Sequence, residues 1–317
     1  MKEKLIVLVG PTASGKTDMG VRLAKKIDGE IISADSMQIY KYMDIGTAKP
    51  TVDEMDGVPH YMIDHIKPDE EFSVAVFREL SEKCIEDILS RNKRPIVVGG
   101  TGLYVNSLTK PWDFSKTEPN ETLRGELEAL AQEKGTYYLH ERLREVDPIS
   151  AQNIHPNNVK RVIRALEVYK TSGKTKSQLD QESMKNELKY EPILLGLSME
   201  RSTLYARIEL RIDKMIEAGL VEEVKKLLNM GYKEDLVSMQ GLGYKEIVKY
   251  LKGEYSLEEA IEILKRDTRH FAKRQLTWFR RDERIKWFKI EDYRSLDQLE
   301  SDALYYLKES GITAFEQ

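Results

Sequence analysis

The residues with the clearest chemical meaning lie near the start of the chain. Gly10, Gly15, Lys16 and Thr17 stand at the spacing G-x-x-x-x-G-K-[ST] of a phosphate-binding loop. Glycines let such a loop wrap around an anion with its N–H groups pointing inward, and the helix that follows adds its positive N-terminal end. Lysine at this position reaches outer phosphate oxygens, and the Thr17 hydroxyl can hold a Mg²⁺ ion. The predicted phosphate site comprises Gly10, Pro11, Thr12, Ala13, Ser14, Gly15, Lys16 and Thr17.

A carboxylate is the second candidate for chemistry. Asp35 ends the apolar segment EIISAD at residues 30–35, whereas the strand-like segment RPIVV at residues 94–98 is followed by two glycines and no acid. If the first segment is a strand of a parallel sheet, Asp35 lies at the carboxyl edge, where such sheets bind ligands. Asp35 can therefore be a general base or a partner of the metal ion, and the alternative is a cap or turn residue.

Elements that would position these residues follow from the apolar pattern. Residues 4–10 predict a strand, which the phosphate loop and a helix to about Lys26 follow. A second strand is expected to end near Ala34, a helix to cover about residues 73–92 with Ser73 as its N-cap, and RPIVV to form a third strand. This alternation of strands and helices predicts an α/β fold, a P-loop-type parallel sheet flanked by helices.

The middle of the chain has a different character. Residues 115–190 carry many charges and a helical pattern that breaks at Gly135, Pro148, Pro156 and Gly173, and EPILLGLSM then forms one more strand. We therefore expect a catalytic core of residues 1–114 and 191–317, interrupted by an all-helical insertion at 115–190.

Two further helices are expected after the insertion. Residues 204–232 predict one long amphipathic helix that closes near Gly231, and the last clear helix begins after Ser256, three residues before Glu259, the spacing of a capping box. Its less polar stripe consists of Leu257, Ile261, Leu264, Thr268, Phe271, Gln275 and Phe279.

Composition sets outer limits on the function. The 317 residues hold one cysteine, Cys84, so a disulfide within the chain and a Cys-rich zinc site are excluded, and a thiol buried in the core is expected. The same lone cysteine favours a cytoplasmic protein, and no apolar run is long enough for a membrane span to be expected. The net charge is −4, yet residues 157–176 hold six Lys or Arg and residues 265–284 hold eight. Such runs are either solvated helix faces or contacts for a polyanion.

Eight motifs, in order along most of the chain, resemble the bacterial tRNA dimethylallyltransferase (tRNA isopentenyltransferase) family. They are GPTASGKT (10–17), ADSMQIY (34–40), GTAKP (46–50), VPHYMIDH (58–65), GGTGLY (99–104), NNVKRVIRALEVY (157–169), MQGLGYKE (239–246) and RHFAKRQLTWFRR (269–281). The resemblance implies transfer of a dimethylallyl group from dimethylallyl diphosphate to N6 of an adenine beside the anticodon of tRNA, with release of diphosphate.

The resemblance also implies catalytic roles. Asp35 would take the proton of the adenine amine as the C–N bond forms, and Arg211 would contact the diphosphate together with Mg²⁺ at Thr17. Thr101 would bond to the adenine or to a phosphate, with a helix N-cap as the alternative. Arg207 lies four residues before Arg211 on the same helix face, and a surface ion pair is the alternative for both.

An adenine in a stacked anticodon loop must be flipped out to react, which requires contacts on several sides. Gln38 has the donor and acceptor that match an adenine edge. For Tyr244, stacking on a base and burial in the core are equal alternatives, and Lys273, Arg274 and Trp278 are expected to flank the groove. The residues implied to bind tRNA are Asp35, Ser36, Met37, Gln38, Thr101, Arg124, Lys160, Arg161, Arg164, Gln240, Gly241 and Lys245.

Three rival functions remain at this stage. An isopentenyltransferase acting on free AMP shares the front half of the motifs but lacks much of the insertion, and a small-molecule kinase would place ATP on the same loop. A non-catalytic RNA-binding module would not need Asp35. The zinc finger that eukaryotic relatives often carry at the C-terminus is absent, since the chain has one cysteine, and nothing in the sequence demands a protein partner beyond a monomer.

Overall fold

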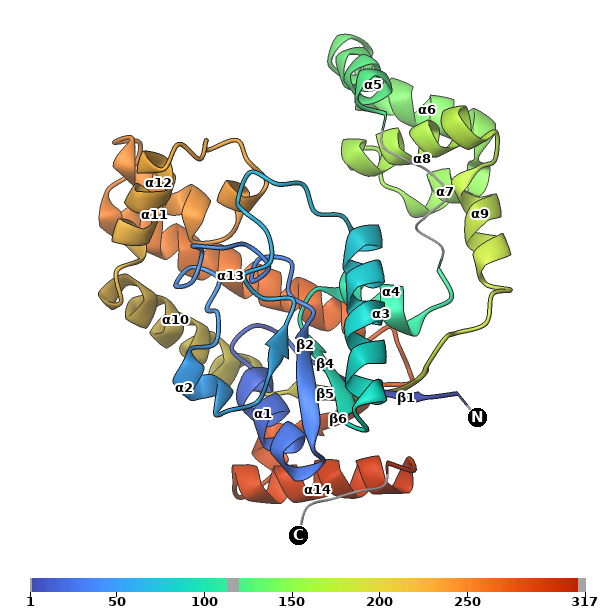
Figure 1. The fold of residues 1–317 in the computed structure, drawn as a ribbon. Helices are drawn as coiled ribbons and strands as arrows, with labels where there is room; N and C mark the ends of the chain where they lie inside the picture. The colour runs from blue at the N-terminus through green and yellow to red at the C-terminus, as the bar shows by residue number, and fades with distance from the viewer. Residues whose placement is uncertain (1, 113–119, 313–317) are drawn as a thin grey trace. The chain divides into compact units, whose positions relative to one another are not determined.

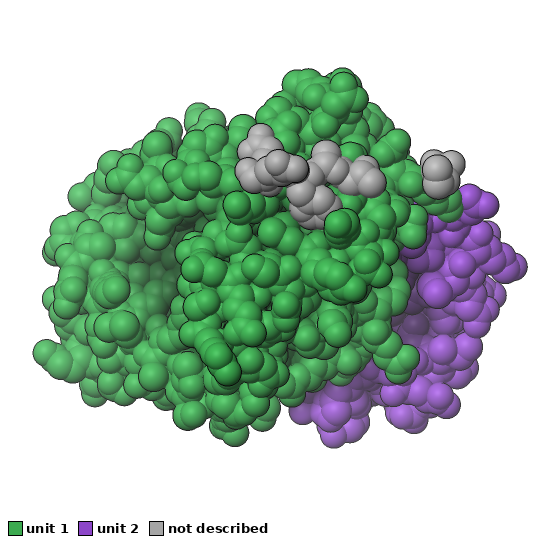
Figure 2. All heavy atoms as spheres, turned by 90° about the horizontal axis from the view of Figure 1, so that it is seen from below, with its two compact units in different colours: residues 1–108, 189–317 green, residues 109–188 purple. Residues whose placement is uncertain are grey.

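The chain divides into two compact units, which Figure 2 colours separately. The computed structural model describes residues 2–112 and 120–312. One unit comprises residues 1–108 and 189–317, and the other comprises residues 109–188. The expected boundary at residue 114 lies outside the described residues, and the boundary expected at residue 190 lies beside Lys189, where the first unit resumes.

The first unit is built on one parallel sheet (Figure 1). Its six strands stand in the order β3-β2-β4-β1-β5-β6. Their bounds are β1 Lys4–Val9, β2 Gly29–Ser33, β3 His60–Tyr61, β4 Arg94–Gly99, β5 Glu191–Ser198 and β6 Lys286–Lys289. The central strand β1, with the sequence KLIVLV, is buried on both faces, as expected of a parallel sheet covered by helices on both sides. The expected P-loop-type α/β fold is confirmed.

Two apolar clusters lie on the two faces of the sheet, and β1 feeds both in alternation. Leu5 and Val7 belong to one cluster and Ile6 and Leu8 to the other, because successive side chains of a strand point to opposite faces. Helices α1 (Lys16–Lys26) and α14 (Leu296–Glu309) cover the face of Ile6. The other face is covered by α3 (Val74–Ser90), α4 (Gly102–Thr109), α10 (Arg201–Glu217), α11 (Leu220–Asn229), α12 (Tyr244–Leu251) and α13 (Leu257–Phe279).

The second unit is all-helical in its described part. It contains α5 (Glu121–Lys134), α6 (Thr136–Val146), α7 (Pro148–Asn153), α8 (Val159–Ser172) and α9 (Lys176–Ser183) around its own apolar cluster. The helix ends match the expected breaks. Gly135 ends α5, Pro148 is the first residue of α7, and Gly173 ends α8 in the left-handed conformation with φ 71°.

Several sequence expectations were wrong in detail. The single helix expected over residues 204–232 is two helices, because Gly219 adopts φ 96° and the chain turns there between α10 and α11. The short helix α2 (Val52–Met55) and strands β3 and β6 were not foreseen, and α14 follows the helix taken as the last. Cys84 is half-buried rather than buried. Ser73 and Ser256 cap α3 and α13 as expected, and across the described ranges no helix has the length and apolar character needed to cross a bilayer.

Candidate active site

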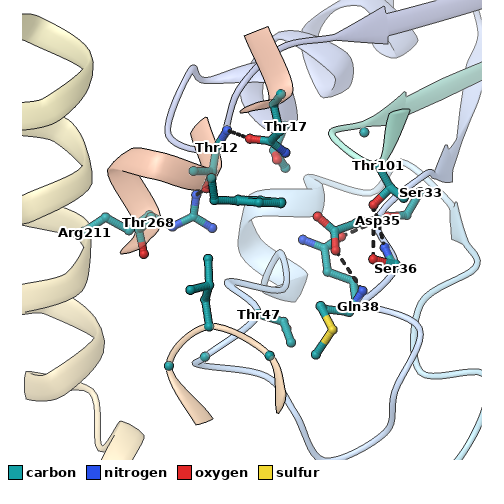
Figure 3. Close-up of a pocket in the computed structure, with 18 of the residues that line it drawn as sticks. Thr12, Thr17, Ser33, Asp35, Ser36, Gln38, Thr47, Thr101, Arg211 and Thr268 are labelled. Carbon is teal, nitrogen blue, oxygen red and sulfur yellow. Dashed lines mark hydrogen bonds between the residues drawn. The ribbon is translucent and has the colours of Figure 1, made fainter. Parts of the chain in front are cut away.

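A cavity of about 370 Å³ lies at the carboxyl edge of the sheet in the first unit (Figure 3). The phosphate loop, the segment after β2, the turn after β4, helix α10, residues 240–245 and helix α13 all contribute to its wall. Predicted site residues that line it are Thr12, Lys16, Thr17, Asp35, Ser36, Met37, Gln38, Thr101, Arg211, Gln240, Gly241 and Lys245. The structure therefore brings the three residues implied to be catalytic into one space.

The phosphate loop has the expected strand–loop–helix setting between β1 and α1. Gly15 adopts φ 84°, and a Cβ on Gly10 would lie 2.7 Å from the Ser14 Oγ and 3.0 Å from a backbone oxygen, so both glycines are required. Lys16 folds back so that its Nζ donates to the carbonyl of Pro11 at 3.4 Å. Burial lowers the pKa of Lys16 to about 8, with Asp35 opposing this shift and Arg211 adding to it. An anion in the loop would therefore favour the charged form of Lys16.

Two arginines of α10 reach this loop. The Nη1 of Arg211 donates to the Oγ1 of Thr12 at 3.1 Å, and Figure 3 shows the side chain extending toward Thr12, with Asp35 across the cavity. Burial lowers the pKa of Arg211, and the charges of Asp35 and Glu54 oppose that shift. Arg207 is exposed, and its Nη2 lies 3.7 Å from the position of a Cβ on Gly15. Neither arginine forms an ion pair with the described residues, so both remain available to an anion.

Asp35 lies on the other side, in a turn just past β2. Its Oδ1 accepts from the N–H of Met37 at 2.9 Å, so the turn role foreseen as an alternative is real, while the side chain still lines the cavity. Thr101 directly precedes α4, yet its Oγ1 accepts from the N–H of Ser36 at 3.0 Å. This bond ties the turn after β4 to the turn after β2 and places Thr101 beside Asp35.

The residues expected to recognise the base are also held by hydrogen bonds. The Oε1 of Gln38 accepts from the Ser33 hydroxyl at 2.9 Å, and its Nε2 donates to the carbonyl of Ala48 at 3.2 Å. One N–H and one lone pair of that amide remain for a ligand. Met37 packs on Gly241, where a Cβ would lie 2.4 Å from the methyl carbon of Met37. This close packing joins the segment after β2 to residues 240–245.

Glu223, which the sequence did not point to, organises the loop at residues 44–47. Its carboxylate accepts from the N–H groups of Asp44 at 2.9 Å, Ile45 at 2.8 Å and Gly46 at 3.0 Å, and from the Tyr244 hydroxyl at 2.7 Å. Gly46 and Thr47 then line the cavity. Tyr244 is fully buried, and burial together with Glu223 raises the pKa of its hydroxyl; the core burial given as one alternative is present, and the residue also lines the cavity.

Gln275 is a second residue of this kind, after Glu223. The sequence placed it in the less polar stripe of α13 and gave it no role in the site. Its Oε1 accepts from the N–H of Thr12 at 2.8 Å, and its Nε2 donates to the carbonyl of Gly100 at 3.0 Å. No signal in a single sequence identifies such a partner, because Gln275 and Thr12 lie at opposite ends of the chain.

Known proteins share this architecture over almost its whole length. A family model described as IPP transferase matches residues 38–282, and a model described as isopentenyl transferase matches residues 3–71. The chain belongs to the IPP transferase family. A relative named tRNA dimethylallyltransferase from Acetivibrio thermocellus is 55% identical over 310 residues, which is 98% of this chain and 99% of the relative. Another of the same name from Clostridioides difficile is 54% identical over 309 residues, 98% of this chain and 99% of that one.

Solved structures agree with this membership. The full-length tRNA isopentenylpyrophosphate transferase from Bacillus halodurans aligns with a TM-score of 0.72 and 46% identity over 97% of this chain and 98% of that chain. A eukaryotic dimethylallyltransferase described as acting on tRNA aligns with a TM-score of 0.83 and 30% identity over 99% of this chain and 81% of that chain.

The second unit of this IPP transferase carries the remaining predicted residues. Arg124 and Arg164 both pair with Glu167, whose side chain is fully buried, at 2.9 Å and 2.6 Å. Burial alone would raise the pKa of Glu167, but the bonds from the Asn120 N–H and the two arginines lower it. Lys160 and Arg161 are exposed on the same helix and form no ion pair within the part of the chain that the structure describes. Arg124 and Arg164 are therefore already paired with a carboxylate, whereas Lys160 and Arg161 are not paired with any described residue.

The basic run at residues 265–284 likewise contains both residues that form ion pairs and residues that do not. Lys265, Arg269 and Arg284 form ion pairs with Asp213, Glu209 and Asp282 respectively. Lys273 and Arg274 are exposed and form none among residues 2–112 and 120–312, and Arg274 lines the cavity. Trp278 packs against the turn after β4, where a Cβ on Gly102 would lie 2.2 Å from its ring.

Proposed function

We propose that this protein transfers a dimethylallyl group from dimethylallyl diphosphate to N6 of an adenine beside the anticodon of tRNA and releases diphosphate. The observation that carries the proposal is the shared cavity, which the two cations Lys16 and Arg211 line together with Asp35 and Thr101. The reaction needs both sets of groups close together, since the diphosphate leaves from the same allylic carbon that the adenine amine attacks. Relatives that match nearly the whole chain carry the corresponding name.

The chemistry follows from the positions of the side chains. The bond between the allyl carbon and the diphosphate oxygen breaks, and the bond between that carbon and N6 forms. The lone pair of N6 is delocalised into the adenine ring, so removal of its proton by the Asp35 carboxylate aids attack, typically by about 10²–10⁴-fold. The departing diphosphate carries the negative charge, which Lys16, Arg211 and the amides of the phosphate loop stabilise.

Magnesium would complete the diphosphate site. The described residues contain no cluster of three His, Cys, Asp or Glu side chains that could hold a metal ion by themselves. Mg²⁺, however, is usually held by one or two protein groups together with substrate phosphates and waters, and the Thr17 hydroxyl lines the cavity at the start of α1. The residues present thus fit Mg²⁺ held by Thr17 and a bound diphosphate, where the ion would supply further positive charge to the leaving group.

The tRNA contacts form a second part of the proposal. Ser36, Met37, Gln38, Gln240, Gly241 and Lys245 line the cavity where a flipped adenine would enter. Lys160 and Arg161 would contact phosphates of the anticodon stem, a salt-dependent and largely sequence-independent interaction. Arg124 and Arg164 are proposed for the same stem, with their pairing to Glu167 fixing the direction of each guanidinium.

Radiolabelled dimethylallyl diphosphate offered to tRNA and to AMP tests the proposal. We expect label on tRNA only, and we expect Asp35→Ala to abolish turnover while tRNA still binds. Label on AMP in preference to tRNA would replace the proposal with a free-nucleotide transferase. Phosphoryl transfer from ATP, with thermal stabilisation by ATP but not by dimethylallyl diphosphate, would replace it with a kinase, and full activity of Asp35→Ala would remove the carboxylate from the mechanism.

A further inference from the structure

Gln275 lies at the junction of the two halves of the cavity. Its side chain comes from α13 and is 5% exposed. The carboxamide bridges two loops that are not otherwise adjacent in the sequence, since Oε1 accepts from the N–H of Thr12 and Nε2 donates to the carbonyl of Gly100. Each bond is of normal length, at 2.8 Å and 3.0 Å.

The two bridged loops serve opposite ends of the reaction. Thr12 belongs to the phosphate loop, and its hydroxyl accepts from Arg211. Gly100 directly precedes Thr101, whose hydroxyl accepts from the N–H of Ser36 beside Asp35. Hydrogen bonds and the short backbone links within Thr12 and between Gly100 and Thr101 therefore connect the diphosphate side to the adenine side, with Gln275 between them.

The surrounding packing is shaped to admit this side chain. A Cβ on Gly100 would lie 2.2 Å from the Nε2 of Gln275, and a Cβ on Gly102 would lie 2.2 Å from the ring of Trp278, one turn further along α13. The glycine-rich turn after β4 is therefore a docking surface for α13. Helix α13 reaches the reaction centre through Gln275 rather than only covering the sheet.

We propose that Gln275 is a positioning residue that sets the separation between the diphosphate grip and the adenine side of the cavity. The inference rests on the proposed function. Without the carboxamide, the N–H of Thr12 and the carbonyl of Gly100 lose their buried partners. The two loops can then shift against each other while each still binds its own substrate. Because a displacement of about 1 Å between reacting groups can cost about 10²-fold in rate, the turnover number is affected more than the affinity.

Steady-state kinetics of Gln275→Met and Gln275→Glu test this. Methionine keeps the volume and removes both hydrogen bonds, so we expect kcat to fall by about 10- to 100-fold while KM for each substrate stays within about threefold. Glutamate keeps the acceptor for Thr12, but when ionised it presents an oxygen to the carbonyl of Gly100. We expect its kcat relative to wild type to rise as the pH falls from about 9 to about 6, since a protonated carboxyl restores the donor. The ratio to wild type corrects for Lys16, Asp35, Arg211 and Arg274, which line the same cavity.

A matched control separates positioning from stability. Phe279 is buried one turn further along α13 and does not line the cavity, so Phe279→Leu should lower the melting temperature without changing kcat. A kcat of Gln275→Met equal to wild type, or a loss of kcat in Phe279→Leu as large as in Gln275→Met, would overturn the inference. If Gln275→Met does not fold, the test is the pH profile of Gln275→Glu. A ratio of its kcat to that of wild type that does not change with pH would then contradict the inference. Failure of the wild-type protein to modify tRNA would instead overturn the proposed function.

Discussion

Replacement of Glu223 is the perturbation whose magnitude the structure defines best. The carboxylate uses Oε2 for the N–H groups of Asp44 and Ile45, and Oε1 for the N–H of Gly46 and the Tyr244 hydroxyl. In Glu223→Gln the amide oxygen can serve one of these two sets only. If it serves the first, the new NH₂ group faces the N–H of Gly46, and one half-buried donor is left without an acceptor.

The expected cost follows from that count. A fully buried, unsatisfied N–H costs about 1–3 kcal/mol; the N–H of Gly46 is only half-buried, but bonds to a charged acceptor are stronger than neutral ones, so Glu223→Gln should lose about 1–3 kcal/mol of unfolding free energy. Tyr244→Phe removes one of the four bonds and leaves a lone pair, which should cost about 1 kcal/mol. Glu223→Ala, which leaves three N–H groups and the Tyr244 hydroxyl unpaired, should be the most damaging of the three.

Urea unfolding at neutral pH measures this series, and steady-state kinetics on the folded variants follow its effect on the cavity. Gly46 and Thr47 line the cavity, so loosening of their loop should raise KM as well as lower stability. The reasoning fails if Glu223→Gln unfolds within about 0.5 kcal/mol of wild type, or if Tyr244→Phe is less stable than Glu223→Gln. Either result would mean that the carboxylate does not organise the loop.

Three other predictions concern charge and backbone. Burial lowers the pKa of Lys16 to about 8. Because the charged form of Lys16 is lost as the pH rises through that value, the affinity for dimethylallyl diphosphate should fall about tenfold between about pH 7 and 9. Calorimetric titrations should show that Lys16→Arg removes this dependence, and an unchanged slope of affinity against pH in that variant would contradict the prediction. Lys160→Ala with Arg161→Ala should lower the salt dependence of tRNA binding by about two counterions and leave KM for the diphosphate unchanged, an expectation that equal salt slopes would refute. Gly219→Ala should cost about 1 kcal/mol or more, because Gly219 has φ 96°; a variant as stable as wild type in urea would show that the turn between α10 and α11 tolerates a side chain.

Most of the sheet could be predicted because its signals are local. Strands β1, β2, β4 and β5 are continuous apolar runs, and the caps of α3 and α13 are Ser73 and Ser256 with the usual spacing to a helix. The missed elements have weak local signals. In β6 only Phe288 is buried, and α14 buries just Leu299, Ala303 and Leu307, a narrow stripe in an otherwise polar helix. Such segments become strand and helix through packing against the sheet and α1 rather than through their own pattern.

The candidate site divides in the same way. The phosphate loop and Asp35 were predictable, since a short motif and the rule for the carboxyl edge of parallel sheets place both. Glu223 and Gln275 were not, because each acts on a segment far away in the chain; the bond between Gln275 and Thr12 spans 263 positions. The helical period correctly placed Gln275 in the less polar stripe of α13. The period does not indicate which groups that stripe packs against.

The basic residues of the second unit show why counting charge is not enough. Lys160, Arg161 and Arg164 lie within one turn of α8, and the sequence treats them alike. In the fold, Arg164 joins Arg124 on the Glu167 carboxylate, which has no exposed surface, and Arg124 also pairs with Glu121 at 2.9 Å, so both positive charges are offset and both guanidinium groups are held in place. Lys160 and Arg161 project from the same helix with their charges unopposed by any described residue. If this unit binds an RNA stem, the salt-dependent part of the affinity therefore comes mainly from Lys160 and Arg161, while Arg124 and Arg164 keep α8 in the orientation that presents them.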